Sequence, residues 1–104
     1  MINGTYRIVM RTLLGNRSGQ ISLFENNNVL TGTIEILNHQ TEIREGSIRK
    51  GKCVFSGEFI TPVRNIPFTA EGKINQKNIS LKVKAGLLDL YISGEEECRD
   101  VKEL

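Results

Sequence analysis

The sequence has few of the residues from which metal sites and catalytic sites are most often built. Its 104 residues include one histidine, two cysteines, two prolines and no tryptophan. With His39 as the sole histidine, at a polar hairpin tip, one chain cannot assemble a metal site of several histidines or a serine–histidine–aspartate triad. The sequence also has no paired-cysteine metal motif and no glycine-rich phosphate loop that opens a helix. We therefore expect no metal, no cofactor and no enzymatic activity.

The two cysteines, Cys53 and Cys98, favour free thiols over a disulfide. The sequence shows no secretory signal, and a reducing cytosol keeps thiols reduced. Cys53 precedes Val54 and Phe55 with the parity of an inward-facing strand residue, whereas Cys98 lies among acidic residues that disfavour its thiolate. We expect a cytoplasmic protein in which neither thiol is catalytic.

Charge is nearly balanced, with 14 basic and 12 acidic residues and a net charge of +2. The basic residues are scattered, except for a small group around the turn at residues 49–52, and this group has no aromatic partners on which nucleic-acid bases would stack. No apolar run approaches the roughly 20 residues that a membrane-spanning helix needs. We therefore expect neither a nucleic-acid partner nor a membrane partner.

The dominant feature of the sequence is an alternation of apolar and polar residues with a period of two, and residues 55–73 show it most clearly. One side of the two strands of this hairpin carries Phe55, Gly57, Phe59, Ile66, Phe68, Ala70 and Gly72. The other side carries Glu58, Thr69, Glu71 and Lys73. Between the strands, Pro62 fixes φ and marks a turn. This pattern is typical of half-buried antiparallel strands.

Three more hairpins of this kind follow one another along the chain. Gly19, Gly46, Gly72 and Gly94 are 27, 26 and 22 residues apart, which indicates an internal repeat. In the last hairpin we expect Leu88, Leu90 and Ile92 to face inward. The sequence predicts an all-β, eight-stranded antiparallel up-and-down barrel of four hairpin repeats over residues 1–95, because closure buries the apolar face and removes both edges. Residues 96–104 form a charged C-terminal tail.

One strand breaks the alternation, because Ile43 and Ile48 are an odd number of residues apart. One extra residue at Glu45–Gly46 would place both isoleucines on the inner face, so we predict a β-bulge there. The alternative is that Arg44 or Glu42 points into the interior.

The barrel interior is the candidate site. Eight strands enclose a space that side chains just fill or that holds one small ligand. The interior residues expected to line it are Tyr6, Met10, Phe55, Phe59 and Phe68. Five inward glycines, at positions 19, 32, 57, 72 and 94, serve either close approach of neighbouring strands or a lined pocket. The sequence favours the first reading.

Four segments resemble a family of small, largely uncharacterised bacterial proteins with a lipocalin-like (calycin-like) β-barrel. These segments are Asn3-Gly-Thr-Tyr6, Thr12-Leu-Leu-Gly15, Leu30-Thr-Gly-Thr33 and Phe55-Ser-Gly-Glu-Phe-Ile-Thr-Pro62. The resemblance covers residues 3 to about 94 and implies the fold, with Thr-Pro-x-Gly-type tips, and no catalytic residues. Only Pro62 and Gly15 remain of the tip prolines and glycines. A few relatives occur beside or fused to flavin-dependent oxidoreductases, which hints at an accessory role but assigns none.

Two functions remain open at this point. The barrel mouth binds a small apolar ligand, or the outer surface docks on a protein partner or on a second copy of the chain. A cavity lined by the five interior residues would favour the ligand. A filled interior with an exposed apolar patch would favour the interaction module.

Overall fold

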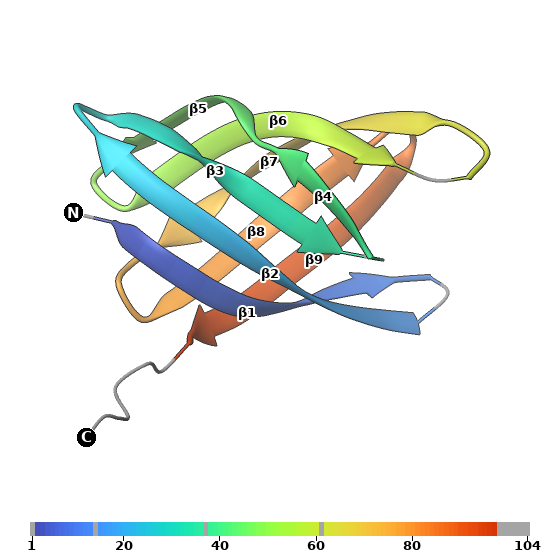
Figure 1. Cartoon of the computed structure of the whole chain (residues 1–104), viewed down its shortest axis with the longest axis horizontal. Coiled ribbons are helices and arrows are strands. Elements are labelled where there is room, and N and C mark those ends of the chain that lie inside the picture. Colours follow the sequence, from blue (N-terminus) through green and yellow to red (C-terminus); the bar gives the residue numbers. More distant parts are fainter. Residues whose placement is uncertain (1, 14, 37, 61, 98–104) are drawn as a thin grey trace.

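The computed structural model describes residues 2–13, 15–36, 38–60 and 62–97. Figure 1 shows strands wound around one interior, and the described residues contain no helix. The strands are β1 (Asn3–Thr12), β2 (Gly15–Asn26), β3 (Val29–Ile36), β4 (His39–Glu42), β5 (Arg44–Arg49), β6 (Lys52–Ile60), β7 (Asn65–Ile74), β8 (Asn78–Ala85) and β9 (Leu88–Glu96). The last strand therefore includes Glu96, one residue more than expected, and most of the expected tail lies outside the described residues.

The sheet closes on itself. Antiparallel ladders join the strands in the order β2-β1-β9-β8-β7-β6-β5-β3, and β2 also pairs with β3, which closes the ring. β4 adds to β3 beyond β5, so β4 and β5 are successive segments of one wall strand that is interrupted at Ile43. The predicted eight-stranded antiparallel up-and-down barrel is confirmed, with one extra strand segment.

The two ends of the barrel differ in their turns. At the end near the N-terminus, here called the N-terminal end, two-residue turns have positive φ at Asn27 and Asn28 (54° and 68°) and at Lys50 and Gly51 (53° and 81°). Such paired positive angles match the right-handed twist of a hairpin. Tyr6 helps to close this end, because its hydroxyl donates a 2.7 Å hydrogen bond to the Asn75 carbonyl oxygen. The opposite end, formed by the turns after β1, β3, β6 and β8, is here called the mouth end.

The predicted bulge lies at Glu45–Gly46. Arg44 pairs with Ser56 and Ser47 pairs with Val54, so two residues of β5 oppose one residue of β6. Glu45 adopts a positive φ of 53°. Both Ile43 and Ile48 are buried as a result. The Arg44 side chain is 61% exposed and lies 3.8 Å from Glu58, and Glu42 is exposed as well, so the alternative that Arg44 or Glu42 points inward is wrong.

Apolar side chains fill the interior, and no polar or charged side chain in the described ranges is buried. The barrel is flattened, with a shortest dimension of 18 Å. Close approach explains four of the five inward glycines. A Cβ atom would overlap a carbonyl oxygen of the neighbouring strand at Gly19, Gly32, Gly72 and Gly94. One inward prediction is wrong: Leu88 is 48% exposed, because the strand begins there beside the turn and has not yet entered the core.

Candidate functional site

The five predicted interior residues do not surround one cavity. Tyr6, Met10, Phe55 and Phe68 are buried, whereas Phe59 is half-buried. Tyr6 lies toward the N-terminal end and Met10 lies on β1 toward the mouth end. Tyr6, Met10 and Phe55 line none of the cavities and grooves described below. The structure brings together only the three phenylalanines.

These three rings form an aromatic cluster on β6 and β7. The Phe68 ring lies across from Gly57, where a Cβ atom would be 2.9 Å from Cζ of that ring. Phe55 meets Phe68 edge to face, with ring centroids 6.4 Å apart and planes at 81°. Phe59 stacks on Phe68 at 4.4 Å and 25°. Gly57 therefore provides the space in which the Phe68 ring sits, which is a packing role rather than a lined pocket.

Beside this cluster the barrel wall has a seam. The β5–β6 ladder ends at the pair of Arg44 and Ser56, and beyond it no ladder joins β4 to the Gly57–Ile60 half of β6 within the described ranges. β4 runs beside this half of β6, but the two segments are not joined by a ladder. A small cavity of about 10 Å³ lies against the seam. It is lined by Ile34, Ile36, His39, Thr41, Glu58, Phe59 and Ile60.

The mouth end carries an apolar rim, which is defined by five exposed residues on its turns and strand ends. They are Leu13 (88% exposed), Ile60 (38%), Val63 (89%), Leu87 (104%) and Leu88 (48%). The described turns of the N-terminal end consist of asparagine, glutamine, lysine and glycine, with Val29 (52% exposed) as an exposed apolar residue at a strand end. Sequence reasoning missed this asymmetry, although leucine and valine within segments identified as turns were a usable signal.

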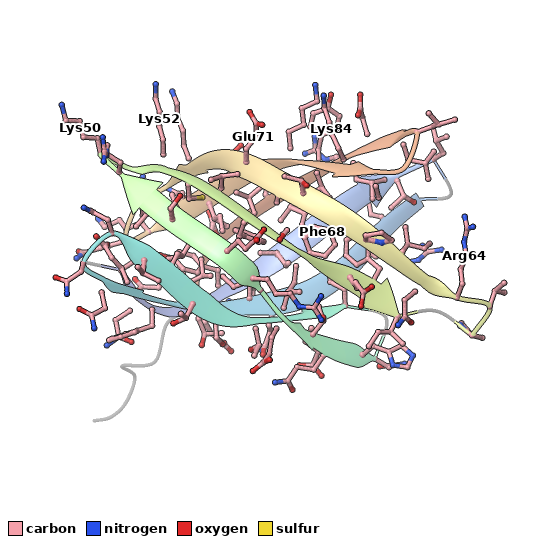
Figure 2. The ribbon with its side chains drawn as sticks, turned by 90° about the horizontal axis from the view of Figure 1, so that it is seen from above. Lys50, Lys52, Arg64, Phe68, Glu71 and Lys84 are labelled. Carbon is pink, nitrogen blue, oxygen red and sulfur yellow. The ribbon has the colours of Figure 1, made fainter. Side chains whose placement is uncertain are left out.

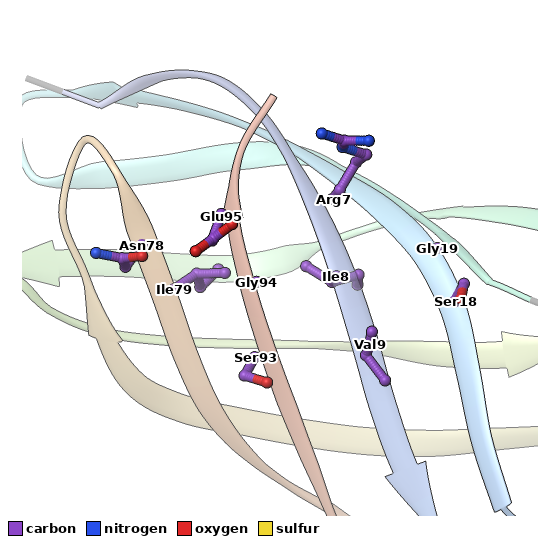
Figure 3. A pocket seen from close by; sticks show the side chains of 10 residues that line it. All are labelled: Arg7, Ile8, Val9, Ser18, Gly19, Asn78, Ile79, Ser93, Gly94 and Glu95. Atoms are coloured by element: carbon purple, nitrogen blue, oxygen red, sulfur yellow. The ribbon is translucent and has the colours of Figure 1, made fainter. Parts of the chain in front are cut away.

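The outer wall carries a broader but shallower groove of about 680 Å³ (Figure 3). Its floor includes Val9 between Ser18 and Ser93, and its sides include Arg7 and Glu95, which are cross-strand partners on β1 and β9. These side chains are exposed or half-exposed. Figure 2 shows that Lys50, Lys52, Glu71 and Lys84 also point away from the barrel. The outer wall is thus a solvated surface with mixed charge.

The titratable groups of the described residues form no reactive centre. Burial raises the pKa of the Cys53 thiol from 9.0 to about 11, so the reactive thiolate is disfavoured. Burial, followed by the nearby Glu96 carboxylate, also raises the pKa of Tyr6. His39 is exposed, as expected for a hairpin tip. The described residues contain no group of three or more histidine, cysteine, aspartate or glutamate side chains arranged for a metal. Cys98 lies outside the described residues.

The architecture defines a class: a closed, flattened, antiparallel β-barrel with one seamed mouth. No protein-family model matches the chain, and no curated protein sequence matches it. Among solved structures, a redesigned β-barrel, mFAP1, bound to DFHBI, is similar to this chain with a TM-score of 0.63. The two share 8% sequence identity, over 91% of this chain and 94% of that one, so the similarity concerns the fold alone. Within the described residues no helix is long and apolar enough to cross a membrane.

Proposed function

We propose that the protein binds a small, mostly apolar molecule at the mouth end of the barrel. The observation that carries this proposal is the unpaired seam between β4 and β6, which lies over an apolar cavity and beside the half-buried Phe59. The apolar rim supports it, because apolar groups exposed together are typical of a binding surface. The barrel mFAP1, which has a similar fold, was solved with the small molecule DFHBI bound.

Binding requires a side chain to move. A cavity of about 10 Å³ has room for one water molecule at most, whereas a cavity of about 150 Å³ lined by apolar residues binds benzene. Phe59 is the residue best placed to move, because it lies on the half of β6 that lacks a partner on the β4 side. Buried apolar area then supplies most of the affinity, and specificity is loose.

The absence of tryptophan from the chain provides a clean test. Phe59→Trp places a single indole at the seam, and Phe24→Trp places one at a 46% exposed position on the outer wall as the matched control. A panel of apolar compounds is titrated into both variants and into the wild-type protein. We expect a one-to-one change in emission for Phe59→Trp only, with a rise in the wild-type melting temperature by mass action. A panel that changes neither emission nor melting temperature would refute ligand binding.

A second candidate function follows from the filled interior and the apolar rim. Leu13, Val63 and Leu87 are almost fully exposed at three different turns of one end. We propose, as the alternative, that this rim docks on a protein partner or on a second copy of the chain. Sedimentation equilibrium tests the second copy: association that disappears in the combined Leu13→Ser, Val63→Ser and Leu87→Ser variant supports it. A monomer at every concentration would leave only a different protein as the partner.

Three further proposals rest on composition and on residue patterns. The protein acts without enzymatic activity, it works in the cytoplasm, and it is related to lipocalin-like barrels. The high pKa of the buried Cys53 thiol supports the first of these, because that thiol is then a poor nucleophile. Assays for hydrolase and redox activity would test it directly.

A further inference from the structure

Most of the phenylalanine rings of the barrel lie together beside the seam. Three of the four phenylalanines of the chain are grouped there, because Phe55 and Phe59 each contact the ring of Phe68. Phe68 presents one face to Phe59 in a stacked arrangement with centroids 4.4 Å apart. The position that Phe59 occupies is therefore a position for a flat ring, bounded on one side by the face of another ring.

The two stacked rings differ in how firmly they are held. Phe68 is 4% exposed, rests in the space left by Gly57, and meets Phe55 at its edge. Phe59 is half-buried and neighbours the exposed Ile60 at the end of β6. Rotation of Phe59 toward the mouth end would leave the face of Phe68 open. The Phe59 ring would then move toward the apolar rim, where Ile60 already lies.

Polar groups line only one part of this cavity. Thr41 and His39 lie on β4 opposite the buried Ile34 and Ile36, so they share the inner face of the wall, and Thr41 is half-buried. The Glu58 side chain lies on the outer face, 3.8 Å from the exposed Arg44 side chain, so its carboxylate does not face the cavity. A molecule that fills the Phe59 position would meet Thr41 or His39 at its edge and apolar side chains on its faces.

From this arrangement we infer that the ligand is a flat aromatic molecule with one hydrogen-bond donor at its edge, which takes the place of the Phe59 ring on Phe68. The inference rests on the proposed function and specifies its ligand class. Long saturated chains fit less well, because the interior beyond the cavity is occupied by buried side chains such as Ile34 and Phe55. A flat ring needs only the thickness of the ring that it displaces.

The test compares three compounds of one skeleton: naphthol, naphthalene without the hydroxyl, and the saturated, non-planar decahydronaphthol. Binding to the wild-type protein is followed by NMR, with dodecanoate as a chain-like apolar probe. We expect naphthol to bind about three- to tenfold more tightly than decahydronaphthol, the range that an aromatic stack contributes. Naphthol should also bind more tightly than naphthalene by a similar factor, because its hydroxyl forms a hydrogen bond that naphthalene cannot form. The largest shifts should fall on Phe59, Phe68 and Thr41.

Variants locate the polar contact. Thr41→Val should weaken naphthol binding and leave naphthalene binding unchanged, whereas Glu58→Gln and Glu71→Gln on the outer face should change the binding of neither compound. Equal or tighter binding of decahydronaphthol or dodecanoate at the seam would overturn the flat-ring inference and leave the proposed function intact. Binding of no compound at all would overturn the proposed function itself. Naphthol shifts confined to the outer groove around Val9 would overturn both.

Discussion

Replacing Gly72 by alanine should strongly destabilise the barrel, although it adds a single methyl group. Gly72 lies on β7 opposite Leu81 of β8. A Cβ atom there would overlap the Ser80 carbonyl oxygen and lie 2.8 Å from the Leu81 Cα atom. Both are backbone atoms, so no side-chain rotation relieves the contact and β8 itself must shift. Overpacking of this kind costs about 1–3 kcal/mol, and each ladder hydrogen bond that the shift weakens costs about 1 kcal/mol more.

We therefore expect Gly72→Ala to lower the free energy of unfolding by about 3 kcal/mol and the melting temperature by about 10–20 °C. The matched control is Gly4→Ala, because the nearest atom to its added methyl group is a flexible Glu96 carboxylate oxygen at 3.8 Å. Its effect should stay within about 0.5–1 kcal/mol. Urea titration with equal m-values for the variants provides the comparison. If Gly72→Ala is as stable as Gly4→Ala, the inward glycines do not serve close approach, and a role in widening the interior must be reconsidered.

Two other predictions concern the bulge and the buried thiol. Glu45→Gly should raise the free energy of unfolding by about 0.5–1 kcal/mol in urea titration, because Glu45 has a φ of 53° that glycine adopts without steric cost; a loss of stability would show that the glutamate side chain matters more than its backbone. For Cys53, the folded state keeps its proton up to about pH 11 while the unfolded chain loses it near pH 9. Stability should therefore fall as pH rises between these values, by about 2–3 kcal/mol from this group. The stability difference between the wild type and Cys53→Ala should narrow over the same interval, and an unchanged difference would contradict the raised pKa.

The fold could be predicted from the sequence because its signals are local and repeated. Alternation with period two identifies the strands, and the parity of Ile43 and Ile48 locates the bulge. Because the sequence predicts no helix to cover the apolar face of the sheet, the sheet must close into a barrel. These signals depend on which side of a strand a residue occupies. Burial at strand ends depends instead on whether the neighbouring strand extends far enough to cover the residue. For that reason Leu88 was wrongly predicted to be buried, and Phe59 is only half-buried although it shares the parity of Phe55.

The candidate site was less predictable for a related reason. The sequence places Phe55, Phe59 and Phe68 on inner faces, but the stacking of Phe59 on Phe68 depends on the register of β6 with β7 and on the space above Gly57. The seam depends on where the β5–β6 ladder ends, and the parity break locates the bulge but does not show that the ladder stops beside it. The predicted common lining by Tyr6, Met10 and the phenylalanines assumed a hollow centre. In a flattened barrel these side chains pack in separate regions of a filled core.

The bulge and the mouth are connected through the wall strand that they share. An extra residue in one strand increases its local twist and bends it away from its partner. Here the extra residue lies at Glu45–Gly46, and the ladder with β6 ends at Arg44 and Ser56, immediately on the mouth side of it. On that side the wall strand continues as β4, which has a ladder with β3, and Phe59 on the facing half of β6 is half-buried. The parity break between Ile43 and Ile48 thus marks, in the sequence, the bulge beyond which the β5–β6 ladder ends.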